Sequence, residues 1–206
     1  MTEPPVEASD LEEVVPGLFH WRIENPLIGG GWSSSHAIAT PEGQVLVDPV
    51  PLAEAALARV EPVAAIVLTA ACHQRAAWRY RRRFGAPVWL PHGSRATEEE
   101  PDERYGDGDF LPGGLRAVHT PGPELPHYSL LLAGQPAVLF SPDLVLRDRA
   151  SGELRFVPPQ YHDDPAETRR SVERSAALDF ELLCLAHGPP LRDGPAALRE
   201  LLARTG

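Results

Sequence analysis

Short apolar runs bounded by proline and glycine recur along the whole chain, and they alternate with segments of helical character. The runs have the length of strands, and several alternate apolar with polar residues, which predicts β-strands. Helix-forming patterns predict helices at 51–60, 73–84, 165–178 and 194–204. The predicted strands are 17–23, 35–50 with a hairpin turn at 41–43, 64–70, 86–91, 113–120, 127–134, 136–143 and 181–188.

The order of these elements repeats. Residues from about 14 to 100 and from about 107 to 206 each begin with strands and continue with strand and helix units. Two sheets packed face to face, with helices outside, would bury all the apolar faces. We therefore predict an α/β (α+β) protein with a single domain at 14–206 made of two similar halves, behind a flexible leader at 1–13. The stretch 94–109, rich in Glu, Asp and Gly, is predicted to be a loop.

Composition narrows the classes of function. The net charge of -10 disfavours a nucleic-acid partner, because such binding depends largely on cationic residues. All apolar runs are shorter than the roughly 18 to 20 residues of a membrane helix, so no membrane partner is expected. The N-terminus lacks the basic start and apolar centre of a secretory signal, which favours a cytoplasmic location. We expect a small-molecule substrate or ligand; the sequence indicates no oligomeric state.

The two cysteines have different surroundings. Cys184 lies inside the apolar run LLCLA, where a buried, inert thiol is expected. Cys72 stands beside His73 in VLTAACHQRAAW, where an apolar strand ends and a helix follows. Neither cysteine belongs to a CxxC pair, and two cysteines are too few for a disulfide framework. Cys72 is therefore the thiol that has a chemical neighbour.

Several stretches together carry a resemblance to a known family. They are SSSHAIATPEGQVLVDPV, RFGAPVWLP, HTPGPELPHYSLLL, VLFSPDLVL and LDFELLCLAHGPPL, in this order. The chain resembles a metallo-β-lactamase-fold protein from about residue 14 to 206. The resemblance implies a four-layer αββα sandwich and hydrolysis by a bound metal ion, for which zinc suits imidazole and carboxylate ligands.

The family's metal motif is only partly present. The family has a strand-end loop of the form His-x-His-x-Asp-His, a histidine after Pro-Gly, a bridging aspartate and a last histidine before glycine. Asp143 in SPDL matches the bridging aspartate, and His187 in AHGPP matches the last histidine. Pro123 follows Pro121-Gly122 where the family has a histidine, and a proline side chain cannot bind metal. At most one of the family's two metal positions is therefore expected to survive.

The strand-end loop can be aligned in two ways. Counting forward from Thr69 puts Ala70, Cys72, Gln74 and Arg75 at the ligand positions, which leaves almost nothing to hold a metal. Counting backward from the helix puts Cys72-His73 where the family has Asp-His. The backward count is preferred, because a surface loop absorbs a deletion more easily than a helix changes register.

On the backward count, the resemblance implies one zinc ion held by Cys72, His73, Asp143 and His187. Four protein ligands are typical of a closed structural site, whereas three leave an open position for water. Without Cys72, the other three would form such an open site. Asp48 in LVDP resembles an aspartate that braces the metal loop without touching the metal.

Each of these residues also has an interpretation without metal. Cys72 would fill space, His73 would be a polar residue at a helix start, Asp143 would cap the next segment, and His187 would be a remnant ligand. Histidines 36, 119 and 127 lie near strand ends as further candidates, and His127 is left out of the metal set. Tyr161 and His162 fall in the loop PPQYHDDP, which is expected to be solvated.

Three functions follow. The first is a single-metal hydrolase of a small ester, thioester or lactone, with His73 and Asp143 as catalytic residues. The second is a catalytically inactive, metal-free member of the fold that serves as a binding or scaffolding module. The third is a thiol-dependent protein in which His73 and the helix start activate Cys72 as a nucleophile.

Overall fold

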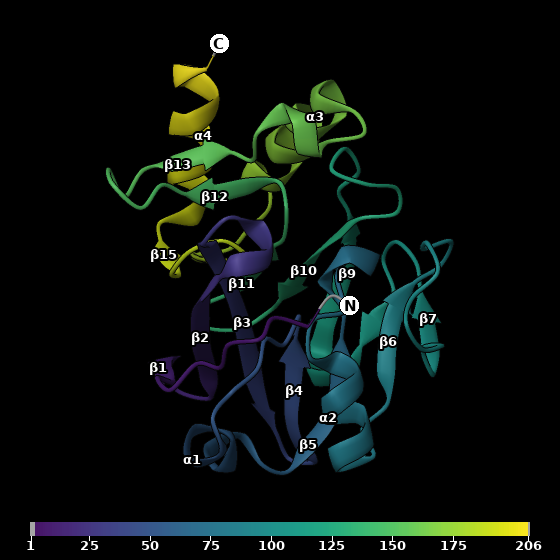
Figure 1. The fold of residues 1–206 in the computed structure, drawn as a ribbon. Coiled ribbons are helices and arrows are strands. Elements are labelled where there is room, and N and C mark those ends of the chain that lie inside the picture. Colours follow the sequence, from purple (N-terminus) through teal and green to yellow (C-terminus); the bar gives the residue numbers. More distant parts are fainter. Residues whose placement is uncertain (1–2, 206) are drawn as a thin grey trace.

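Two β-sheets pack face to face, with helices on their outer faces (Figure 1). The computed structural model describes residues 3–205. Figure 1 shows α3 and α4 at one end of the molecule and α1 and α2 at the other. The predicted four-layer αββα sandwich is confirmed.

The first sheet contains seven strands in chain order. The antiparallel pairs at its start give way to parallel pairing from β4 onward. Its strands are β1 (Glu12–Val15), β2 (Leu18–Asn25), β3 (Gly31–Thr40), β4 (Gly43–Val47), β5 (Val63–Val67), β6 (Val88–Pro91) and β7 (Glu103–Tyr105).

The second sheet has the order β15-β14-β11-β10-β9-β8, and within it β11 and β14 are parallel. A separate hairpin, β12 (Val145–Arg147) and β13 (Leu154–Phe156), follows β11. The strands of the sheet are β8 (Phe110–Leu111), β9 (Leu115–His119), β10 (Tyr128–Leu132), β11 (Val138–Ser141), β14 (Leu182–Leu185) and β15 (Leu191–Arg192).

The helices are α1 (Glu54–Leu57), α2 (Ala77–Phe84), α3 (Pro165–Ala176) and α4 (Gly194–Arg204). Two of them are shorter than predicted. The helix expected at 51–60 is a single α-helical turn followed by a 3-10 turn at Ala58–Val60. The helix expected at 73–84 begins at Ala77, because Ala71–His73 form a 3-10 turn and Arg75 has the positive φ of 43°.

Alternation along the strands creates three apolar layers. Val45 of β4 points between the sheets, whereas its neighbour Leu46 packs with α1 and α2. In the second sheet, Phe140 of β11 also points between the sheets, and Leu139 packs under α3 and α4. Both faces of each central strand are therefore buried, as the continuous apolar runs indicate. Cys184 lies in the layer between the sheets and is 1% exposed, as predicted.

The structure adds pairing that the sequence did not predict. The expected loop at 94–109 contains β7, whose three residues pair with β6 at the sheet edge. The hairpin β12–β13 was not predicted, because its strands are three residues each and carry little periodicity. Near the N-terminus, Ala8 bridges to Leu52. No helix within residues 3–205 is long and apolar enough to cross a membrane.

Two histidines lie side by side within the first sheet. His20 of β2 pairs with His36 of β3, and their ring centroids are 5.2 Å apart. Both side chains are buried, and both Nε2 atoms lack a hydrogen-bond partner. Burial, together with the charge of Arg22, lowers the pKa of His20 from 6.5 to about 4. The fold therefore favours the neutral ring.

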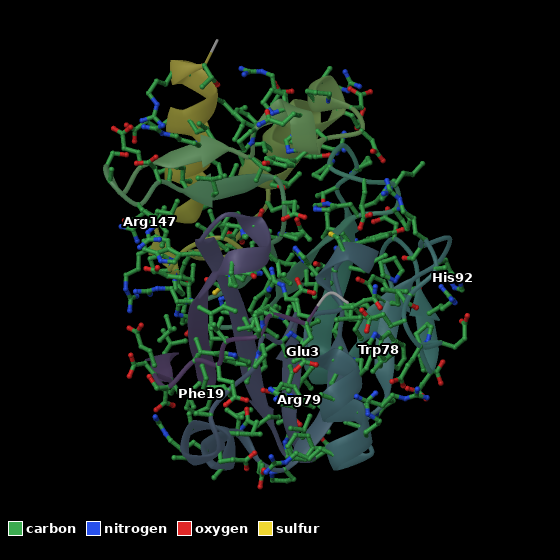
Figure 2. All side chains as sticks on the ribbon, in the orientation of Figure 1. Glu3, Phe19, Trp78, Arg79, His92 and Arg147 are labelled. Atoms are coloured by element: carbon green, nitrogen blue, oxygen red, sulfur yellow. The ribbon has the colours of Figure 1, made fainter. Side chains whose placement is uncertain are left out.

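Burial of His20 should make the protein lose stability in acid at pH values above those at which carboxylates titrate. Below pH 6.5 the unfolded chain protonates residue 20, whereas the folded chain does so only near pH 4. The stabilisation is present above pH 6.5 and is lost as the pH falls to 4, by about 3 kcal/mol. Urea unfolding between pH 4 and 7 should show a shallower loss of stability for His20→Phe than for the unchanged protein. His92→Gln is the control, since His92 lies at the periphery (Figure 2); equal slopes for all three proteins would contradict the prediction.

Candidate metal centre

The predicted ligands meet where parallel strands end. Cys72 and His73 follow β5, Asp143 follows β11, and His187 follows β14. Because β11 and β14 are parallel neighbours, their carboxyl ends adjoin and bring Asp143 next to His187. In the other sheet, the parallel pair β4–β5 brings Asp48 next to the start of the Cys72-His73 loop. The face-to-face packing of the sheets then joins the two edges.

Asp48 organises the loop after β5. Its carboxylate is 3% exposed, and it accepts hydrogen bonds from Thr69 N (2.9 Å), Thr69 Oγ1 (2.6 Å) and His73 Nδ1 (2.9 Å). Although burial raises the pKa of Asp48, His73 and Arg75 lower it below its ordinary value. Asp48 adopts the left-handed φ of 47°, a strained conformation for a non-glycine residue. Among the predicted ligands it bonds His73.

The ring of His73 is bound by Asp48 at one nitrogen and faces Asp143 with the other. Its Nδ1 donates to Asp48, so Nε2 faces Asp143 at 3.3 Å from Oδ1. Burial alone lowers the pKa of His73, but the carboxylates of Asp143 and Asp48 outweigh it and raise the pKa to about 9. At neutral pH and without an ion, the ring is therefore an imidazolium between two carboxylates. A metal ion would take the place of the Nε2 proton.

His187 approaches Asp143 from the second sheet. Its Nδ1 lies 2.7 Å from the carbonyl oxygen of Trp32, which can only accept, so Nδ1 carries a hydrogen. Its Nε2 lies 2.7 Å from Asp143 Oδ1. Burial raises the pKa of Asp143, yet the rings of His73 and His187 hold it well below its ordinary value. Asp143 is therefore an ionised carboxylate shared by two imidazoles.

Cys72 completes the cluster without being activated. Its Sγ lies 3.5 Å from Asp143 Oδ2, and its backbone N donates to Glu124 Oε1 (3.3 Å). Although the residue as a whole is exposed, desolvation of the sulfur and the charges of Asp143 and Glu124 raise the pKa of the thiol well above its ordinary value. A nucleophilic cysteine requires the opposite shift, so the thiol-dependent hypothesis has no support from this geometry.

The donors fit one zinc ion. Within residues 3–205, the ligand atoms of Cys72, His73 and Asp143 lie within 4.8 Å of one another. Neighbouring ligands of a tetrahedral zinc are roughly 3.3 to 3.6 Å apart, given the usual zinc–nitrogen and zinc–sulfur distances. His73 Nε2 lies 3.3 Å from Asp143 Oδ1, and Cys72 Sγ lies 3.5 Å from Asp143 Oδ2, so each separation falls in this range but to a different oxygen of the carboxylate. His187 lies outside this group; its Nε2 is 2.7 Å from Asp143 Oδ1, and its ring meets that of His73 edge to face, with 6.1 Å between centroids.

The other residues of the strand-end loop have structural bonds. Gln74 accepts from Trp78 Nε1 (2.8 Å) and donates to Ala71 O (3.0 Å). Arg75 is buried and donates to Ser34 O (2.6 Å) and to the backbone oxygen of Asp48 (2.9 Å). The forward count would make both residues ligands, but their polar atoms bind the protein itself.

Two histidines outside the predicted set also support Asp143. His127 is fully buried, and its Nε2 accepts from the backbone N of Asp143 (3.2 Å) while Nδ1 bonds Thr120 O (2.6 Å). His162, expected in a solvated loop, is half-buried with its Nε2 buried and unpartnered, and its ring bonds the backbone of Asp143. No spacing signal marks either residue, because each reaches Asp143 from a distant part of the chain.

Comparisons with known proteins agree with this architecture. A family model described as the metallo-beta-lactamase superfamily matches residues 13–205. None of the curated proteins compared with the chain matches it. The resemblance seen in the sequence motifs is confirmed.

Three solved structures illustrate the shared fold. The DIM-1 metallo-beta-lactamase has a TM-score of 0.75 at 14% identity, with 96% of each chain covered. A metallo-beta-lactamase from Pontibacter korlensis has a TM-score of 0.72 at 18% identity, covering 94% of this chain and 98% of that one. A metallo-beta-lactamase family protein from Thermus thermophilus has a TM-score of 0.70 at 19% identity, covering 94% and 80%. At these identities the likeness shows the fold alone.

The Asp48–His73 pair can be tested directly. In protein stripped of metal, Asp48→Asn removes one of the two carboxylates that keep His73 protonated, so the pKa of His73 should fall below about 9. Because a buried charge then loses a partner, the free energy of unfolding should drop by about 3 kcal/mol. Histidine titration by NMR and urea unfolding measure the two effects. The exposed substitution Asp179→Asn should change neither; an unaltered His73 titration in Asp48→Asn would refute the role of Asp48.

Thiol reactivity tests the state of Cys72. Because the thiol's pKa is raised when no ion is bound, its reaction with iodoacetamide in protein stripped of metal should be slow at pH 7 and should still accelerate as the pH passes 9.0, the ordinary thiol value. Labelling is followed by mass spectrometry, and Cys72→Ser reports the background from the buried Cys184. Rapid labelling at pH 6 that is absent from Cys72→Ser would instead restore the nucleophile hypothesis.

Proposed function

Because the chain belongs to the metallo-beta-lactamase superfamily, we propose that it is a hydrolase with one zinc ion that acts on small esters, thioesters or lactones. Cys72, His73 and Asp143 would hold the ion, and three protein ligands leave the open position of a catalytic site. A zinc ion in such a site polarises a carbonyl group and lowers the pKa of water to near neutrality.

The observation that carries the proposal is the orientation of His73. Its Nδ1 is bound by a buried carboxylate, and its Nε2 points at a second carboxylate beside a thiol. A histidine that is fixed in this way by an outer carboxylate is the usual arrangement of a metal ligand. The bracing is built into the end of the sheet, so the ring is pre-oriented without an ion.

Asp143 and His187 have complementary tasks. The backbone of Asp143 is held by His127, which keeps its carboxylate facing the loop after β5. His187 Nε2 lies 2.7 Å from Asp143 Oδ1, at the rim of the cluster where both side chains are half-buried. His187 is thus placed to hold a proton at Nε2 and to give it to a leaving group. In this arrangement His187 transfers a proton, whereas in a closed site of four ligands it would bind the zinc ion.

The surroundings favour a small substrate with an apolar group. The cavity beneath the cluster has a volume of only about 10 Å³, so a substrate must approach from the surface, where Cys72 is exposed. Exposed apolar side chains flank that approach: Leu125 (66% exposed) follows Glu124, which binds Cys72, and Tyr161 (69%) precedes His162. Single exposed apolar side chains are common on proteins, so these two are proposed as substrate contacts only because each is next in the chain to a residue of the cluster or its support.

A second candidate is the metal-free binding module. In the absence of any ion, the carboxylate of Asp143 pairs with the imidazolium of His73 and lies within hydrogen-bond distance of His187. The cluster would then brace the two sheets, and the exposed apolar side chains would serve binding alone. Metal content separates the two candidates.

Elemental analysis tests the zinc site. Protein purified without a histidine tag should contain about one zinc ion per chain, because three convergent donors bind zinc tightly. The double variant Cys72→Ala, His73→Ala should contain none, and His92→Gln should keep the full amount. If the unchanged protein is metal-free and stays so after zinc is offered, the hydrolase proposal fails and the binding module stands.

Hydrolysis can then be measured on the zinc-loaded protein. p-Nitrophenyl acetate, an acyl thioester and a simple lactone represent the three substrate classes. We expect turnover of at least one of them to fall by about 100-fold or more in His187→Gln, within the range typical of a lost proton-transfer group. Zinc content should be unchanged in that variant. Equal turnover in His187→Gln would remove His187 from the reaction.

A further inference from the structure

A small cavity lies between the sheets, directly beneath the cluster. Its volume is about 10 Å³, and polar side chains of Ser34, His36, Asp48, Thr69 and Ser141 take part in its lining. It therefore touches the carboxylate that braces His73 and the turn that carries Asp143. Space of this size is about the minimum that one water molecule needs, and bound water also requires two to four polar partners.

His36 lines this cavity and has an unused nitrogen. The side chain is 3% exposed, and its ring packs against Phe140 of the opposite sheet and against His20, each at 5.2 Å between centroids. Its Nε2 is buried and has no hydrogen-bond partner in the protein. Buried polar groups in folded proteins are nearly always paired with protein or ordered water. A partner for this nitrogen must come from the cavity.

The ring is neutral, which suits such a partner. Burial lowers the pKa of His36 well below its ordinary value, and the charges of neighbouring His20 and Arg75 lower it further. A neutral imidazole offers one donor and one acceptor nitrogen, so it can bind a water molecule in either orientation.

Asp48 has one acceptor site to spare. An ionised carboxylate offers about four lone-pair positions. Asp48 Oδ2 accepts from Thr69 Oγ1 and from His73, whereas Oδ1 accepts only from the backbone N of Thr69. A donor inside the cavity would complete the set.

We propose that this cavity binds a single water molecule through His36 Nε2, and that His36 is thereby a positioning residue for Asp48 and, through it, for His73. The water donates one hydrogen bond to the carboxylate of Asp48 and makes a second hydrogen bond with Nε2 of His36. The strained backbone of Asp48 (φ 47°) is then held from its side chain as well as from its main chain. This inference goes beyond the proposed function, because the Asp48–His73 pair exists with or without an ion.

The experiment has two readouts that do not depend on activity. A high-resolution crystal structure of the unchanged protein should show one water within about 3.2 Å of His36 Nε2. In NMR, the hydrogen on His73 Nδ1 reports its bond to Asp48. In His36→Phe, that hydrogen should exchange with solvent about tenfold faster, a factor expected for the loss of one hydrogen bond.

Two further variants keep the result specific. His36→Gln retains a hydrogen-bonding group and should restore slow exchange at His73. His20→Phe alters the other ring of the pair, which does not line the cavity, and should leave the exchange unchanged. A cavity without water in the crystal overturns the proposal, and so does equal His73 exchange in His36→Phe and the unchanged protein. Thermal unfolding of each variant confirms that it is folded before exchange is compared.

Discussion

The buried contact between Asp48 and His73 is the interaction on which the cluster depends. It joins the end of β4 to the loop after β5, and it is strengthened by the two bonds from Thr69 to the same carboxylate. Because His73 is anchored at Nδ1, its other nitrogen can only face Asp143. A charged pair in such a dry place is costly to separate, so the ring orientation is part of the folded state itself.

The cluster also depends on the parallel pairing of strands. β4 with β5 and β11 with β14 place two carboxyl-terminal edges at the same side of the sandwich. The first edge carries Asp48 and the Cys72-His73 loop, and the second carries Asp143 and His187. Neither edge alone supplies the three donors: Cys72 and His73 come from one sheet and Asp143 from the other. Packing of apolar side chains between the sheets therefore positions polar chemistry at their rim.

The lost family ligands have changed what this rim can do. Pro123 cannot bind metal, and the loop after β5 carries no His-x-His. Asp143 nevertheless has four imidazoles around it, from His73, His127, His162 and His187. Two of them bind its carboxylate and two contact its backbone. Because four rings contact Asp143, we expect its carboxylate to have a well-defined position, and so to fix the position of any ion bound to it.

Much of the fold could be predicted from the sequence alone. Residue alternation in runs such as VLFS and LLCL places side chains of one strand in two different apolar layers, which requires a sheet covered on both faces. The inert burial of Cys184 followed from the same run. Short elements were missed, among them β7 and the hairpin β12–β13, because three residues carry too little periodicity to be recognised. Helix α2 also begins later than predicted, because Arg75 just before it has a positive φ.

The candidate site was likewise predictable in part from the sequence, while the rest depended on the fold. The sequence placed donor residues near predicted strand ends, which are local properties, and the resemblance to the family singled out Cys72, His73, Asp143 and His187 among them. Only the tertiary structure decided that three of them converge while His187 pairs with Asp143 from outside. It also brought His127 and His162 to Asp143, and His36 to the cavity beneath Asp48. The reason is physical. The group of Cys72, His73 and Asp143 joins two sheets, so its distances depend on how the apolar layers between those sheets pack. Most of the other contacts depend on which strands pair within a sheet, and none of them is given by spacing along the chain.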